Sequence, residues 1–285
     1  MTCEIINESA NGTVNPVGNN PKPTLVIDAG MGNWSLFFYP LAQELRKFAK
    51  VCLISRDGYL DSYSSPKSMV SVAQQMKDTL EINHIQEPII LVGHSLGGLH
   101  VRMFQHLFPQ MVKGMILLDA AHPLMLEVIP DLKSNLEKQI RMVKILRLLA
   151  KLGLLKFAKS NIPTFGLPLF LHKKYFKVTT HAKYYRTYQA EMKGFESKLS
   201  TCNTLSDLGT LPLLIISSRQ GLNNRIEENL TQEKPVDQVW LGLQADLAKL
   251  SLNSTFITSK GDHFLHLTDT DFVANFIREF YNKII

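Results

Sequence analysis

Hydrophobic and polar positions follow two alternating patterns along the chain. Short apolar runs, typical of buried strands, occur at residues 25–28, 51–55, 89–92, 115–119 and 213–217, and a last strand is expected at residues 254–258. Apolar residues at helical spacing predict helices at residues 36–48, 68–82, 96–107, 236–250 and 269–280. A further short strand is expected at residues 3–6, before a polar stretch rich in Asn, Pro and Gly. This alternation predicts an α/β fold, with a mostly parallel sheet covered by helices on both faces.

The most informative segment follows the apolar run at residues 89–92 and reads Gly93-His94-Ser95-Leu96-Gly97. It connects a predicted strand to a predicted helix, and its two glycines permit a sharp turn around the serine. Ser95 would then be exposed at the carboxyl end of a strand and at the positive end of a helix. Because this geometry serves nucleophilic acyl transfer, Ser95 is the candidate nucleophile.

At these residues the chain resembles the α/β-hydrolase superfamily, and three further segments extend the resemblance. Asp28-Ala29-Gly30-Met31-Gly32 is similar to the oxyanion loop of the branch with an Asp/Glu-Ala-Gly-x-Gly motif. Residues 55–62 resemble the Arg-x-Gly-x-Gly-x-Ser loop, with Leu60 where a glycine is usual. Lys260-Gly261-Asp262-His263-Phe264 resembles the late histidine loop. The resemblance covers residues 24–123 and 205–281.

The resemblance implies a hydrolase core formed by residues 1–123 and 206–285, with a helical lid inserted at residues 124–205. It also implies a serine hydrolase that cleaves a carboxylic ester through an acyl-enzyme. Thioester, lactone, amide and carbon–carbon bonds remain alternative substrates, since the same catalytic groups cleave them. A non-catalytic protein that binds ligands on the same scaffold is the alternative class.

The family's chain order selects the base and the acid. His263 is the expected base, with His266 as its rival. Residues 218–224 contain no carboxylate where the usual acid stands, so Asp119, at the end of the preceding strand, is the expected acid. Asp207 and Glu227 are the lesser candidates.

The oxyanion of an acyl-transfer reaction needs donors that are already in place. By position in the motifs, the backbone N–H groups of Met31 and Leu96 are the expected donors. The chain contains no P-loop, zinc-ligand spacing or dinucleotide-binding fingerprint, so neither a cofactor or metal nor a nucleic-acid partner is expected. A small-molecule ester, with or without a long acyl chain, is the expected partner.

Composition is ordinary for a globular protein, with 285 residues, 45% of them hydrophobic and 20% charged. The widely spaced Cys3, Cys52 and Cys202 suit neither a disulfide framework nor a zinc site, and Cys52 is expected to be a small buried side chain. The N-terminus lacks the pattern of a signal peptide and no apolar run is long enough to span a membrane, which predicts a cytoplasmic location. The sequence makes no prediction of oligomeric state.

Charge is unevenly distributed. The net charge is +6, yet residues 124–200 contain 15 Lys and Arg against 5 Asp and Glu, a balance of +10. In one interpretation the basic lid docks on an anionic membrane surface or covers an acyl chain. In the other, the basic residues form a solvated face over a helix that packs on the core.

Overall fold

The computed structural model describes residues 1–7, 22–60, 68–220 and 235–285. Its strands form one sheet in the order β1-β3-β2-β4-β5-β6-β7. β1 pairs antiparallel with β3, and every other pair is parallel. The sequence-based prediction of a mostly parallel α/β sheet is therefore confirmed. The strands are β1 (Thr2–Ile6), β2 (Thr24–Asp28), β3 (Val51–Ser55), β4 (Ile89–His94), β5 (Val112–Leu118), β6 (Leu213–Ser218) and β7 (Ser254–Ser259).

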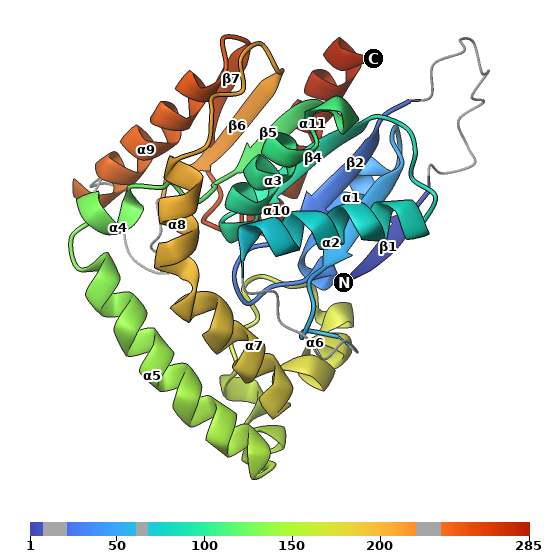
Figure 1. Cartoon of the computed structure of the whole chain (residues 1–285). Coiled ribbons are helices and arrows are strands. Elements are labelled where there is room, and N and C mark those ends of the chain that lie inside the picture. The colour runs from blue at the N-terminus through green and yellow to red at the C-terminus, as the bar shows by residue number, and fades with distance from the viewer. Residues whose placement is uncertain (8–21, 61–67, 221–234) are drawn as a thin grey trace.

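Helices cover both faces of this sheet (Figure 1). α1 and α11 contribute to the apolar core on one face, and α2, α3 and α9 to the core on the other. The helices outside the long segment between β5 and β6 are η1 (Ser35–Phe38), α1 (Tyr39–Leu45), α2 (Met69–Ile82), α3 (Leu96–Leu107), η2 (Pro109–Met111), α9 (Pro235–Leu247), η6 (Ala248–Leu250), α10 (Leu265–Thr268) and α11 (Thr270–Ile284), where η marks a 3-10 helix.

Residues 124–205 lie between β5 and β6 and form a helical insertion that extends away from the sheet (Figure 1). Within it, α5 and α7 pack against each other, and α7 continues almost directly into α8. Its helices are α4 (Met125–Val128), α5 (Leu132–Lys151), η3 (Leu154–Lys156), η4 (Lys159–Asn161), η5 (Leu169–Leu171), α6 (His172–Thr179), α7 (Ala182–Lys193) and α8 (Phe195–Asn203).

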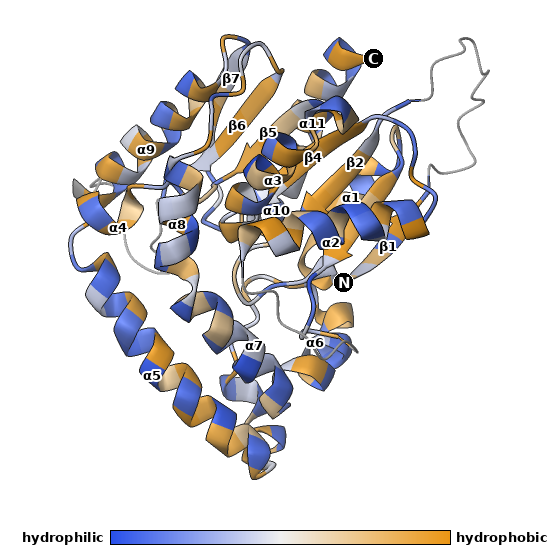
Figure 2. Cartoon of the chain, in the orientation of Figure 1, coloured by the Kyte–Doolittle hydropathy of each residue, from blue (hydrophilic) through white to orange (hydrophobic). Residues whose placement is uncertain are grey.

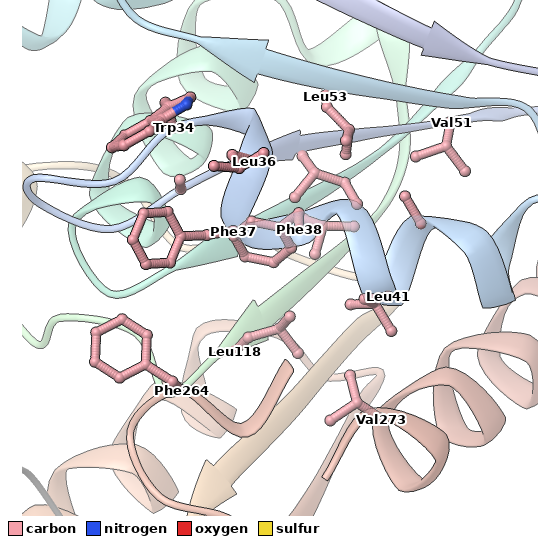
Figure 3. Close-up of a cluster of buried hydrophobic side chains, with 14 of the residues drawn as sticks. Trp34, Leu36, Phe37, Phe38, Leu41, Val51, Leu53, Leu118, Phe264 and Val273 are labelled. Atoms are coloured by element: carbon pink, nitrogen blue, oxygen red, sulfur yellow. The ribbon is translucent and has the colours of Figure 1, made fainter. Parts of the chain in front are cut away.

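The segment after residues 28–32, the predicted oxyanion loop, anchors that loop in the core (Figure 3). Phe37 and Phe38 are almost fully buried beside Leu118 of β5 and Phe264 of the histidine loop. The sequence predicts one helix over residues 36–48, whereas the structure has η1 followed by the shorter α1. Pro40 lies in the first turn of α1, where its missing N–H leaves no hydrogen bond unmade.

Cys3 and Cys52 form a disulfide, with their Cα atoms 5.9 Å apart. The expectation that the cysteines form no such bond is therefore wrong. The reason is topological: β1 lies antiparallel beside β3, which brings together two residues 49 positions apart in the chain. Cys202 is buried and free.

In the described ranges, no helix combines the length and the apolar character that crossing a membrane requires.

Candidate active site

Ser95 occupies a strained turn between β4 and α3. Its backbone has φ 51° and ψ −121°, a conformation that is uncommon for a residue with a side chain. Both flanking glycines are needed for this turn. A Cβ on Gly93 would lie 2.7 Å from the carbonyl oxygen of Gly97, and a Cβ on Gly97 would lie 2.3 Å from that of Asp28. The local sequence therefore presents Ser95, half-buried, at the carboxyl end of β4.

His263 and Asp119 lie in hydrogen-bonding contact, although 144 residues separate them in the chain. His263 follows β7 and Asp119 follows β5, and His263 Nδ1 is 2.6 Å from Asp119 Oδ2. An ionised carboxylate only accepts hydrogen bonds, so Nδ1 carries the proton and Nε2 of a neutral ring is the basic atom. Among the described residues, Nε2 has no hydrogen-bond partner, which leaves it available to Ser95.

Three donors hold the Asp119 carboxylate in place. Its Oδ1 accepts from the Ser217 hydroxyl at 3.0 Å, the Ser218 N–H at 2.9 Å and the Trp240 indole N–H at 2.8 Å. Asp119 is fully buried, with φ 42°. Such a fixed carboxylate can hold one imidazole tautomer and stabilise its protonated form.

Two further histidines pack around His263 but differ from it in environment. His266 is fully buried, stacks on Phe38 with ring centroids 4.1 Å apart, and neither of its ring nitrogens has a partner in the described structure. Burial and the nearby His263 lower the pKa of His266 to about 3. His94 Nε2 lies 2.8 Å from the His263 carbonyl oxygen, to which only an N–H can donate. Burial, His266 and His263 lower the pKa of His94 well below its usual range.

The oxyanion loop lies against the turn that carries Ser95. A Cβ on Gly30 would be 2.9 Å from His94 Nδ1 and 3.1 Å from Ser95 Cβ. In the part of the chain that the structure describes, the N–H groups of Met31 and Leu96 have no protein acceptor. Both are therefore free to donate to an oxyanion.

Ser95 and His263 line one cavity of about 490 Å³ between the strand ends and the helical insertion. The described residues around it include no Asp, Glu, Lys or Arg; most are apolar or aromatic, such as Val143, Phe165 and Tyr184. Burial raises the pKa of Tyr185 and Tyr188 to about 12, with the charge of Glu191 adding to the effect at Tyr188, so these phenols stay neutral. This cavity suits an uncharged, largely apolar ligand.

Comparison with known proteins agrees with this architecture. A sequence model of the α/β hydrolase fold matches residues 23–154. A thermophilic esterase from Thermogutta terrifontis superposes with a TM-score of 0.66 at 16% identity, covering 99% of this chain and 93% of that one. A putative acyltransferase from Salmonella enterica superposes with a TM-score of 0.68 at 14% identity, covering 93% of this chain and 90% of that one. Protein phosphatase methylesterase 1 of Schizosaccharomyces pombe is 30% identical over 145 residues, 45% of this chain and 42% of that protein.

The chain has the α/β-hydrolase fold, and the matching sequence model covers residues 23–154 of it. The structural likenesses, all below 25% identity, support the fold alone. The chain spans less than half the length of the curated relatives that it matches.

Within this α/β-hydrolase fold, the carboxylate beside His263 follows β5 and not the more usual strand. Ser217 and Ser218, at the end of β6 where the acid usually follows, instead donate hydrogen bonds to Asp119. Asp207 is exposed, and Glu227 lies outside the described residues. The catalytic roles of Ser95, His263 and Asp119 stay predictions.

Sequence reasoning missed several residues that support the site. No local motif marks the three donors to Asp119, which are far from it in the chain. Trp240 is 121 positions away, and Ser217 and Ser218 are 98 and 99 positions away. Their only sequence signal is that polar side chains occur inside otherwise apolar segments, where a buried polar group needs a partner.

Proposed function

We propose that this protein is a serine hydrolase that cleaves uncharged carboxylic esters through an acyl-enzyme. The observation that carries the proposal is the hydrogen bond between His263 and the buried Asp119, with His263 lining the same cavity as the strained Ser95. The partial sequence similarity to protein phosphatase methylesterase 1 adds support for ester chemistry.

In the proposed reaction, Ser95 Oγ attacks the ester carbonyl carbon while its proton moves to His263 Nε2. Asp119 stabilises the resulting imidazolium, and the N–H groups of Met31 and Leu96 donate to the oxyanion. The tetrahedral intermediate collapses, and the leaving alkoxide takes the proton from His263. Water then gives a proton to His263 and attacks the acyl-enzyme carbonyl carbon. When this second tetrahedral intermediate collapses, Ser95 Oγ takes the proton back from His263 and the carboxylic acid leaves.

The helical insertion supplies most of the cavity wall, and we propose that it acts as a lid that selects the substrate. Leu136, Val143 and Leu146 of α5 face Tyr184 and Tyr188 of α7 across the same cavity. Because these groups offer no countercharge, an ionised substrate would lose its hydration without gaining a partner. The expected substrate therefore has an apolar acyl group or an apolar alcohol.

A panel of nitrophenyl esters tests this proposal. A neutral ester of medium acyl length is expected to have a kcat/KM at least about 100-fold higher than an ester of equal length whose acyl chain ends in a carboxylate. Initial rates by absorbance give the comparison. Equal rates for the two esters would contradict the proposal that the site selects uncharged substrates.

A thioester and an amide of the same acyl group test which type of bond is cleaved. If only one of these is turned over and the esters are not, that reaction replaces ester cleavage in the proposal. Absence of any turnover, together with no labelling by a fluorophosphonate, would favour the ligand-binding alternative.

We also propose that the insertion contacts anionic lipid. Met142, Ile145, Leu148 and Leu152 recur at helical spacing and are all exposed on α5. Figure 2 shows apolar and hydrophilic residues interleaved along this helix. The hydrophilic ones include five basic residues, Lys138, Arg141, Lys144, Arg147 and Lys151. An exposed apolar stripe with basic flanks suits a negatively charged membrane surface.

Sedimentation with vesicles tests this contact. Binding to vesicles that contain phosphatidylserine is expected to exceed binding to pure phosphatidylcholine, and to weaken as salt rises. Leu148→Glu is expected to reduce this binding. The matched control is Ile82→Glu, which places the same charge at another exposed apolar position, at the end of α2. Equal effects of the two substitutions, or equal binding to both vesicles, would leave only the solvated basic face. A cytoplasmic location stays a prediction.

A further inference from the structure

A buried carboxylate from the helical insertion reaches the oxyanion loop of the core. Glu191 lies near the end of α7 and is 4% exposed. Its Oε1 accepts from Arg56 Nε at 2.8 Å, and its Oε2 accepts from the Gly32 N–H at 3.0 Å and the Tyr59 hydroxyl at 2.5 Å. Gly32 directly follows Met31 in the chain, so this lid residue contacts the backbone beside a proposed oxyanion donor.

Arg56, the partner of Glu191, holds the preceding part of the same loop. Its guanidinium donates to Asp28 Oδ1 at 2.5 Å and to the carbonyl oxygens of Ala29 and Gly30, each at 2.7 Å. Burial alone would lower the pKa of Arg56, but the charges of Asp28 and Glu191 outweigh it and raise the pKa. The guanidinium therefore stays charged, with carboxylates on two sides.

These contacts fix two consecutive peptide planes. The Gly30 carbonyl and the Met31 N–H belong to one planar peptide unit, so the hydrogen bond from Arg56 to that carbonyl sets the direction of the N–H. The Gly32 N–H belongs to the next unit and donates both to Glu191 Oε2 and to the Tyr59 hydroxyl oxygen, each at 3.0 Å. Glu191 thus acts on the donor twice, through Gly32 and through Arg56.

The packing of α7 against the loop strengthens this coupling. Gly32 has φ +77°, and a Cβ there would lie 3.0 Å from the ring of Tyr188, one helical turn before the end of α7. A buried ion pair is a weak source of stability, because the desolvation of both charges offsets much of their attraction. Its place beside the oxyanion loop is better explained by a need for one fixed geometry.

We propose that Glu191 is a positioning residue that keeps the Met31 N–H aimed at the oxyanion, so that the site is complete only with the insertion seated on the core. The proposal rests on the proposed ester hydrolysis at Ser95. If the Met31 N–H points away from the oxyanion, it stabilises the transition state less, and kcat falls. The substrate still binds in the cavity in its ground state, so KM changes little.

Glu191→Gln tests the proposal, because it keeps the shape of the side chain and removes its charge. We expect kcat to fall about 10- to 100-fold while KM changes less than about threefold. Affinity for a trifluoromethyl ketone, whose adduct with Ser95 carries an oxyanion, should fall in parallel with kcat. Affinity for the matching ether, which forms no oxyanion, should not change.

Thr187→Val is the matched control. Thr187 lies on the same helix and donates to the Gly58 carbonyl at 3.1 Å, so its substitution also removes a contact between the insertion and the core. It makes no hydrogen bond to the oxyanion loop in the described structure, and we expect it to keep wild-type kcat. An equal fall in kcat for both variants would overturn the specific role of Glu191. So would an unchanged kcat in Glu191→Gln, or a rise in KM alone.

Amide hydrogen exchange in the wild-type protein provides a test that does not depend on the folding of any variant. The Gly32 amide, bonded to Glu191 and Tyr59, should exchange much more slowly than the Met31 amide, which has no acceptor among the described residues. Equal exchange of the two would overturn the proposal. Fluorophosphonate labelling separates failure of this proposal from failure of the proposed function. If the probe does not label wild-type Ser95, the proposed ester hydrolysis is rejected. If it labels the wild type and Glu191→Gln at equal rates, only the role of Glu191 is rejected.

Discussion

Ser95→Ala is expected to lower kcat by about 10⁶-fold, the scale seen for the loss of an activated serine nucleophile in other hydrolases. The substitution removes the Oγ that forms the acyl-enzyme and adds no bulk, so the cavity keeps its shape. Initial rates on the best ester of the panel, with a thermal melt of each protein, give the comparison. Labelling by a fluorophosphonate should disappear as well, because the probe needs the same oxygen.

Ser71→Ala is the matched control, since it removes one hydroxyl from α2 at a position where that hydroxyl only bonds the Ser68 carbonyl. It should keep wild-type turnover and labelling. If folded Ser95→Ala keeps more than a tenth of the wild-type activity, Ser95 is not the nucleophile.

The sequence predicts those parts of the molecule that short segments determine. The strands that end at Asp28 and His94 are apolar runs whose length identifies them without knowledge of their neighbours. The turn at Ser95 is equally local, because Gly93 and Gly97 lie within two residues of it. Since parallel strands present their carboxyl ends at one edge of the sheet, the convergence of Ser95, Asp119 and His263 follows from the order of the segments.

Other features depend on contacts between distant segments, which periodicity does not encode. Glu191 lies in a polar helix without a motif, and its bonds to Arg56 and Gly32 join residues 135 and 159 positions apart. The indole of Trp240 is predictable as an apolar group but not as the donor to Asp119. The disulfide depends on β1 pairing antiparallel with β3 at the edge of the sheet. The sequence of a five-residue strand does not predict which strand it pairs with or in which direction.

His263→Ala is expected to reduce turnover as severely as the loss of Ser95, because nucleophile and base act as one unit. Without the imidazole, the Ser95 hydroxyl has no group to take its proton and the leaving alkoxide has no acid. The Asp119 carboxylate, 2.6 Å from the ring in the wild type, lies too deep in the protein to replace it. Burst kinetics on the best ester should then show that the rate constants of both acylation and deacylation have fallen. The fluorophosphonate should label Ser95 at a strongly reduced rate.

His266→Phe separates His263 from its rival. Phenylalanine keeps the stacking of His266 on Phe38 and removes two ring nitrogens that make no hydrogen bond in the described structure. With a pKa of about 3, His266 is neutral at the near-neutral pH of the assay, and its side chain is fully buried. Its loss should therefore change kcat by less than about tenfold. If His266→Phe abolishes turnover while His263→Ala retains it, the base is His266. The hydrogen bond between Asp119 and His263 would then serve the fold and not the reaction.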